Sequence, residues 1–254
     1  MLIRSPISTT TLVQAIIAMT AILPEPAQAG VVIDATRVIY PASRKEVSVS
    51  LHNTGEAPSL VQTWTDAGEA SAKPGETRTP FALPPPLFRL DPAKGQTLRL
   101  TYTQEPLPTD RETIFWLNVL DIPPRVPTDP NAPNRLEMAF RHRLKVLFRP
   151  QGLPGKPADA ARAVTWAVVR LNGRTVLEAS NPTPYFISFA KAEVTTAGAT
   201  VAAVVDMVAP FASKRFALTG ANFRAQGPVA VQYGFVDDFG AVINGSADAS
   251  VAPD

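Results

Sequence analysis

The chain has 254 residues, of which 24 are basic and 22 acidic, so its net charge of +2 is too even for an electrostatic nucleic-acid binder. It contains no cysteine, which excludes disulfide bonds, thiolate zinc sites, thiol catalysis and iron–sulfur clusters. Histidine occurs only as His52 and His142, which excludes a histidine-rich metal site, and we expect neither a metal nor a cofactor.

The first 29 residues are predicted to be an export signal. Arg4 precedes an apolar stretch that Pro24 ends, and Ala27-Gln28-Ala29 is the small-x-small pattern that signal peptidase recognises. A transmembrane anchor is the alternative, but it needs about 20 apolar residues, and the proline leaves too few. We therefore expect a mature chain that begins at Gly30 and does not insert into a membrane. An exported chain without disulfides fits a bacterial periplasm.

Residues 30–150 are predicted to form β-strands almost throughout. Residues 47–51 and 96–102 alternate strictly between apolar and polar side chains, which is the period of a half-buried strand. Residues 113–120 form a denser apolar run, typical of a central strand. No window of a dozen residues here keeps a helical period free of proline. Further strands are predicted at 31–33, 38–40 and 60–64.

A segment rich in proline and glycine, residues 150–159, is predicted to be a linker to a second set of strands. Asn172-Gly173 separates two β-rich runs, 164–171 and 175–177, which is a strong signal for a hairpin. Further strands are predicted at 185–189, 200–208, 214–218 and 229–236.

The predicted fold is therefore all-β, with two immunoglobulin-like β-sandwich domains. Each half has the length and strand number of such a sandwich. The linker favours a division into residues 30–150 and 151–254. One large barrel is the alternative for an all-β chain of this length.

No catalytic residues are predicted. The chain lacks the motifs G-x-S-x-G, H-E-x-x-H, G-x-G-x-x-G and G-x-x-x-x-G-K-[ST]. His52 and His142 are expected to be surface or edge histidines, and Asp237-Asp238 an ion-paired turn. The basic residues Arg141, Arg143, Lys145 and Arg149 could form an anion patch, but no exposed aromatic residues alternate with them on their own face.

One predicted strand is too long for its domain. Residues 136–149 alternate throughout, whereas a sandwich strand usually has about five or six residues. Its downstream apolar residues, Leu144, Val146 and Phe148, can serve the domain core. The upstream apolar residues point to the same side of the strand but should lie beyond that core. They are Leu136, Met138 and Phe140. The segment is either a hairpin arm folded over its own sheet or an edge offered to another chain, and we favour the second.

Several motifs in chain order resemble those of periplasmic pilus-assembly chaperones of the chaperone–usher family. The resemblance covers essentially all of the chain after residue 29. The motifs are Thr36-Arg37-Val38-Ile39-Tyr40-Pro41, Pro85-Pro86-Leu87-Phe88-Arg89-Leu90, Gly95-Gln96-Thr97-Leu98-Arg99, Leu107-Pro108-Thr109-Asp110-Arg111-Glu112, Phe115-Trp116-Leu117-Asn118, Asp121-Ile122-Pro123-Pro124, Leu144-Lys145-Val146-Leu147-Phe148-Arg149-Pro150, Asn181-Pro182-Thr183-Pro184-Tyr185 and Asp238-Phe239-Gly240.

This resemblance implies a boomerang of two domains that binds, folds and caps pilus subunits by donor-strand complementation and delivers them to an outer-membrane usher. It implies that Arg37 and Lys145 hold the C-terminal carboxylate of the subunit in the cleft between the domains. It also implies that Leu136, Met138 and Phe140 fill the subunit's groove.

The resemblance further implies a structural network of ion pairs between the domains, formed by Glu112, Arg149 and Asp238. Two other classes of protein remain as alternatives. One is an exported adhesion or carbohydrate-binding module with two immunoglobulin-like domains, which would not need Arg37 and Lys145 to converge. The other is an exported β-sandwich enzyme, which would need convergent acid and base groups that the sequence does not offer.

Overall fold

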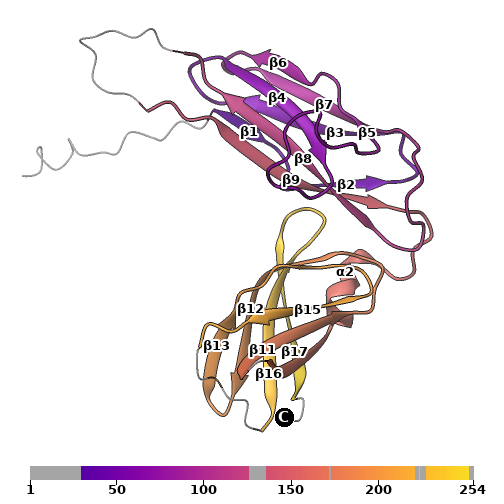
Figure 1. Cartoon of the computed structure of the whole chain (residues 1–254), viewed down its shortest axis with the longest axis vertical. Helices are drawn as coiled ribbons and strands as arrows, with labels where there is room; N and C mark the ends of the chain where they lie inside the picture. Colours follow the sequence, from indigo (N-terminus) through magenta and orange to yellow (C-terminus); the bar gives the residue numbers. More distant parts are fainter. Residues whose placement is uncertain (1–29, 126–135, 172, 221–222, 224–226, 252–254) are drawn as a thin grey trace, which may run out of the picture.

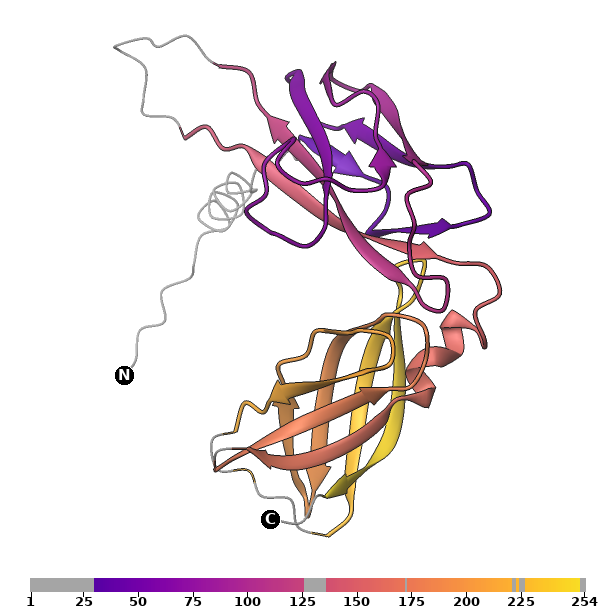
Figure 2. The same cartoon turned by 45° about the vertical axis from the view of Figure 1, so that its right-hand side comes forward.

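The computed structural model describes residues 30–125, 136–171, 173–220, 223 and 227–251, and the predicted export signal lies outside them. Figure 1 shows two bodies of β-strands set at an angle and joined at one end, where the short helix α2 (Pro157–Ala160) lies. A view turned by 45° shows the same bent arrangement (Figure 2). The prediction of an all-β chain with two sandwich domains is confirmed.

In the described N-terminal part, two sheets face each other. The four-stranded sheet has the order β1-β3-β7-β5, and the five-stranded sheet has the order β2-β9-β8-β4-β6. The strands are β1 (Val31–Ile33), β2 (Arg37–Pro41), β3 (Glu46–Asn53), β4 (Ser59–Asp66), β5 (Phe81–Ala82), β6 (Leu87–Leu90), β7 (Gly95–Tyr102), β8 (Thr113–Ile122) and β9 (Phe140–Arg149).

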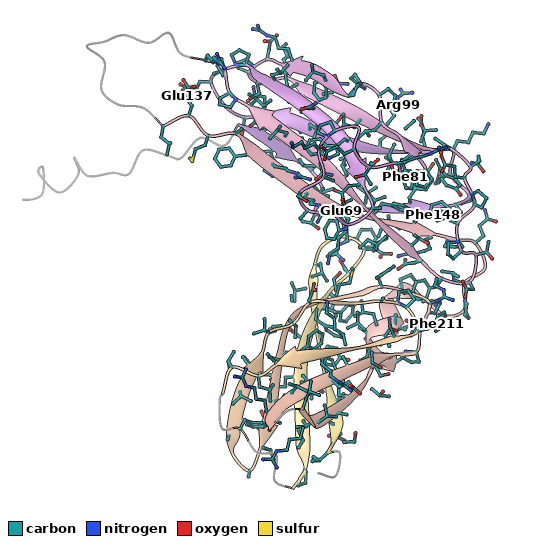
Figure 3. All side chains as sticks on the ribbon, viewed as in Figure 1. Glu69, Phe81, Arg99, Glu137, Phe148 and Phe211 are labelled. Atoms are coloured by element: carbon teal, nitrogen blue, oxygen red, sulfur yellow. The ribbon has the colours of Figure 1, made fainter. Side chains whose placement is uncertain are left out.

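The chain changes sheets within its first described residues. β1 pairs with β3 in one sheet, whereas β2 pairs in parallel with β9 in the other. Between the sheets lies an apolar core that includes the fully buried Tyr40 and an aromatic group in which the Phe81 and Phe148 rings lie 6.4 Å apart (Figure 3). The prediction that Leu144, Val146 and Phe148 serve the core is confirmed.

The predicted strand at 136–149 is shorter in the structure, because β9 begins only at Phe140. The last pair that β8 and β9 form is Asp121 with Phe140. Among the described residues, no strand lies beside 136–139, so these residues have no backbone partner that would define them as a strand. The tertiary partner, not the alternation, determines where this strand starts.

The described C-terminal part forms one eight-stranded sheet that curves around its own core. A 3-10 turn, η1 (Ala161–Ala163), follows α2. The strands are β10 (Thr165–Leu171), β11 (Arg174–Asn181), β12 (Ile187–Thr196), β13 (Ala199–Ala203), β14 (Met207–Val208), β15 (Ala212–Ala217), β16 (Val229–Val236) and β17 (Val242–Val251).

The predicted hairpin of this domain is confirmed, since β10 and β11 pair up to Leu171 and Arg174, and Gly173 has a φ of +76°. An isolated bridge between Ala203 and Leu218 joins the end of β13 to the segment after β15. The strands of this domain therefore almost close into a ring.

Two predictions about this part need correction, and one strand was not predicted. The predicted strand 200–208 is two strands, β13 and β14, interrupted at residues 204–206. The predicted linker 150–159 overlaps the first three residues of α2, since Pro157 suits a first helical position and Ala160 packs into the core. Sequence analysis missed β17, whose small and polar residues form a strand because β16 pairs with it from Val229 to Val236.

Candidate functional site: the interdomain cleft and the start of β9

Arg37 and Lys145 lie side by side at the junction of the two domains. They are direct partners in the parallel pairing of β2 with β9, so both side chains leave the same face of the sheet. Arg37 donates through Nη1 to the backbone oxygen of Val236, at 3.0 Å. Lys145 donates through Nζ to Oγ of Ser188, at 2.9 Å. The structure thus brings together the two cations named by the resemblance and directs both at the C-terminal domain.

Both cations are only weakly compensated. Burial lowers the pKa of Lys145, and the neighbouring charge of Arg37 lowers it further. Burial also lowers the pKa of Arg37, and Asp238 and Asp237 oppose this effect. Nε of Arg37 is buried without a hydrogen-bond partner, and the partners of both cations are neutral oxygens. An anion at this place would therefore be stabilised by two partly desolvated positive charges.

A small cavity of about 110 Å³ opens beside Arg37 between the domains. Arg149 lines it from the N-terminal domain, and Tyr185 and Phe239 line it from the C-terminal domain. Phe239 is 95% exposed at the tip of the turn between β16 and β17. Figure 2 shows this turn reaching from the C-terminal domain toward the end of β9.

Glu112, Arg149 and Asp238 are joined by ion pairs across the junction. Nε of Arg149 donates to Oε1 of Glu112 at 2.6 Å, and its two Nη atoms donate to the Asp238 carboxylate at 2.7 and 2.9 Å. Glu112 also accepts a hydrogen bond from the backbone N–H of Phe186 at 2.7 Å. One buried carboxylate therefore holds β9 and the C-terminal domain together.

The energetics of this group depend on all three members. Burial raises the pKa of Glu112, and the charge of Arg149 opposes that rise. Burial alone would lower the pKa of Arg149, but Asp238 and Glu112 raise it above its ordinary value. Removal of the guanidinium would leave the fully buried carboxylate of Glu112 without its countercharge.

The apolar residues before and at the start of β9 are exposed. The exposed fraction is 81% for Leu136 and 52% for both Met138 and Phe140. Glu137, labelled in Figure 3, lies on the segment that extends away from the N-terminal domain at this point. None of these side chains joins the domain core among the described residues, so their apolar surface is available to another chain.

The edge of β9 is open over its first half. β8 pairs with β9 from Phe140 to Phe148, but β2 covers the other edge only from Lys145 to Arg149. In the described part of the chain, the edge from Phe140 to Leu144 has no further strand. Open strand edges are sites at which another chain can add a strand.

Sequence analysis missed the partners of the other basic residues of β9. The Arg141 guanidinium lies 4.7 Å from the ring centre of Trp64, and that of Arg143 lies 4.1 Å from that of Trp116. Trp116 comes from β8, which pairs with β9, and Trp64 comes from β4 on the far side of β8, so alternation within β9 could not reveal them. Each guanidinium is thus stacked on a ring and does not form a free anion patch.

Arg143 also pairs with Asp66, whose side chain is fully buried, at 2.6 Å. Burial alone would raise the pKa of Asp66, but hydrogen bonds from Arg143, Asn118 and the N–H of Gly68 lower it below its usual range. The remaining polar residues considered in the sequence have local roles: His52 pairs with Asp34 at the surface, and Asp237 accepts hydrogen bonds within its own turn.

Fold and cleft together define a class of protein with two immunoglobulin-like domains and a cationic junction between them. The comparisons name the family. Residues 30–154 match the family described as "Pili and flagellar-assembly chaperone, PapD N-terminal domain", and residues 159–247 match "Pili assembly chaperone PapD, C-terminal domain". The chain belongs to this family of pilus-assembly chaperones, and its role is that of a chaperone in the assembly of pilus subunits.

Individual relatives agree with this assignment. The chain is 45% identical to the chaperone protein FimB/FhaD of Bordetella pertussis over 89% of this chain and 90% of the relative. It is 40% identical to the probable fimbrial chaperone YadV of Escherichia coli over 86% of this chain and 89% of the relative.

Solved structures agree as well. The crystal structure of the YadV chaperone matches with a TM-score of 0.74 and 38% identity, covering 87% of this chain and all of that chain. The SafB chaperone, solved in complex with the SafA pilin of Salmonella enterica, matches with a TM-score of 0.70 and 31% identity, covering 86% of this chain and 96% of that chain. In the described part of the present chain, no helix has the length and apolarity that a membrane span requires.

Proposed function

We propose that the protein is a periplasmic chaperone that binds a pilus subunit by adding its own β9 edge to the subunit, and delivers that subunit to an outer-membrane usher. The observation that carries this proposal is the open edge of β9 from Phe140 to Leu144, followed directly by the cation pair at Lys145 and Arg37. The solved complex of the related SafB chaperone with a pilin supports it.

The position of β2 supports a carboxylate as the group that the two cations bind. β2 occupies the edge of β9 from Lys145 onward, so a strand added along Phe140 to Leu144 has to end where β2 begins. Arg37 is the first residue of β2 and stands at that point. A chain that terminates there presents its C-terminal carboxylate to Arg37 and Lys145, and it runs parallel to β9.

The apolar residues add binding energy in an alternating pattern. Leu136, Met138 and Phe140 share one side of the extended chain, and they are exposed in the free protein. Burial of each in a subunit groove contributes roughly 1.5–3 kcal/mol, before the cost of ordering the segment is subtracted. The groove of an incomplete subunit is thereby covered until the subunit is passed on.

Glu112, Arg149 and Asp238 have a structural role in this proposal, because they hold the two domains at the angle that places Ser188 and Val236 beside the cations. We also propose that the division between the domains lies near residue 150, that residues 1–29 are a cleaved export signal, and that the protein acts by binding, without catalysis.

The test is to co-express the tagged full-length precursor in a bacterial periplasm with the pilin candidates of its own organism. We expect a pilin to co-purify with the wild-type protein and to be absent with Lys145→Ala. Equal recovery of pilin with both proteins would contradict the carboxylate site. Recovery of no pilin with the wild type would contradict the proposed partner.

A further inference from the structure

The Asp121 carboxylate occupies an unusual position at the end of the N-terminal sandwich. The residue is only 5% exposed, and its parity on β8 is that of the core residues Leu117 and Val119. One oxygen, Oδ2, accepts a hydrogen bond from the backbone N–H of Val31 at 3.0 Å. The other oxygen, Oδ1, is buried and has no hydrogen-bond partner. A buried carboxylate oxygen without a partner is costly, so a hydrogen-bond donor or cation placed beside it would stabilise the folded protein.

Gly30 is the residue nearest to this carboxylate on the N-terminal side. A Cβ atom added to Gly30 would overlap Oδ2 of Asp121, so the two residues are in close contact and a side chain at position 30 would have to displace the carboxylate. The backbone nitrogen of Gly30 is bonded to the same Cα, which places it within about 5 Å of that oxygen by covalent geometry. The carbonyl of Gly30 is held by the N–H of Thr54 at 3.0 Å, so the residue is anchored from the other side.

The chemistry at Gly30 changes if the export signal is removed as proposed above. Hydrolysis of the peptide bond between Ala29 and Gly30 consumes one water, leaves a carboxylate on Ala29 and creates an α-ammonium group on Gly30. In the precursor this nitrogen is a neutral amide with a single N–H. In the mature chain it is a cation with three N–H donors.

We propose that Asp121 is the binding site for the α-ammonium group of the mature chain, and that this intramolecular ion pair closes the end of the N-terminal sandwich. The inference rests on the proposed cleavage after Ala29. Asp121 pairs with Phe140 in the register of β8 and β9, so the ion pair lies directly beside the first residue of the open β9 edge. Maturation therefore completes the support of the strand that the proposed function uses.

The experiment compares four proteins that are exported and processed from full-length precursors. Two carry the native N-terminus, with Asp121 or with Asp121→Asn. Two carry one alanine inserted between Ala29 and Gly30, again with Asp121 or with Asp121→Asn. Intact mass identifies the N-terminus of each preparation. The readouts are the melting temperature and the rate at which an amine-selective acylating reagent modifies the α-amino group at neutral pH.

With the native N-terminus, we expect Asp121→Asn to lower the melting temperature by several degrees and to speed α-acylation about fivefold or more, as the loss of roughly 1 kcal/mol of protection implies. With the inserted alanine, we expect Asp121→Asn to lower the melting temperature less and to leave the acylation rate unchanged. Asp34→Asn, at the exposed pair with His52, is the matched control and should leave acylation unchanged.

Three outcomes would overturn the proposal. If Asp121→Asn has the same effect in both series, Asp121 serves only the N–H of Val31. If the native α-amino group reacts as fast with Asp121 as with the variant, it is not paired. If the intact mass places the N-terminus elsewhere than Gly30, both this proposal and the proposed cleavage fail, whereas the pilin experiment remains a separate test of the chaperone function.

Discussion

Ser188 and Val236 are cross-strand partners on β12 and β16, and together they accept the two cations of the other domain. Arg37 and Lys145 are likewise cross-strand partners, on β2 and β9. One cross-strand residue pair of each domain therefore faces the other pair across the junction. This arrangement leaves the charge of both cations only weakly compensated, which is the state that the proposed carboxylate requires.

The first prediction concerns this cation pair. Arg37→Ala and Lys145→Ala, made singly, should each reduce subunit affinity by a factor that corresponds to about 2–5 kcal/mol, because each removes one side of a desolvated charge pair. Co-purification of a subunit with each variant measures the effect. Ser188→Ala is the matched control: it removes the oxygen that Lys145 contacts but neither cation, so it should retain the subunit. Loss of the subunit with Ser188→Ala alone would contradict the carboxylate site.

The second prediction concerns the parity of the exposed segment. Met138→Glu or Phe140→Glu should abolish subunit binding, because each would place an unpaired charge in an apolar groove. Ala139 points to the opposite side, so Ala139→Ser should change subunit binding little. Both Met138 and Phe140 are half exposed, so neither glutamate variant should lower the melting temperature of the free protein much. Unfolding of the free protein by Met138→Glu would show that this residue belongs to its own core.

The third prediction concerns the ion pairs at the junction. Arg149→Ala should destabilise the protein by about 3–5 kcal/mol, because it leaves the buried carboxylate of Glu112 without its countercharge. Asp238→Ala should lower the free energy of unfolding less than Arg149→Ala does, since Asp238 is about one-third exposed. Urea unfolding measures both, and small-angle scattering reports the angle between the domains. An equal loss in the free energy of unfolding for the two variants would contradict the central role of Glu112.

The fourth prediction concerns pH. The pKa of Asp66 is lowered in the folded protein, so its contribution to stability is present above its unfolded pKa and is lost as pH falls through the folded value. Asp66→Asn should therefore be less stable than the wild type at pH 7, and the difference should shrink on acidification below about pH 4. Urea unfolding of both proteins at pH 7 and below about pH 4 tests this.

The control for this pH effect is Asp91→Asn, which removes an exposed ion pair with Arg89. It should change stability little at either pH, because exposed pairs contribute little. A gap between wild type and Asp66→Asn that stays constant from pH 7 to the acid range would mean that the Asp66 carboxylate is not the titrating group.

Much of the fold follows from local pattern. Strict alternation at 96–102 corresponds to β7, and the Asn-Gly pair lies between β10 and β11. The start of β9 could not be predicted, because it depends on where its partner β8 ends. β17 could not be predicted, because its own residues are mostly small and polar and it is held by pairing with β16. Local alternation shows which residues face inward, but not where a neighbouring strand ends.

The candidate site, too, could be predicted from the sequence only in part. Arg37, Lys145, Glu112, Arg149 and Asp238 could be named only through motifs shared with a family, since nothing in their spacing brings them together. Three contacts escaped notice because each joins residues that are distant in sequence and of ordinary type: Arg143 with Asp66, Lys145 with Ser188, and Val31 with Asp121.

The parallel pairing of β2 with β9 has a consequence for the time at which the protein becomes competent. In the export proposed above, the N-terminus arrives first, so Arg37 arrives long before Lys145. The two cations lie side by side only after β9 has been exported and has paired with β2. The two paired residues are separated by more than a hundred residues of chain. Until then the proposed carboxylate site does not exist. On this proposal, a half-exported chain cannot capture a subunit, and binding is delayed until the N-terminal domain is complete.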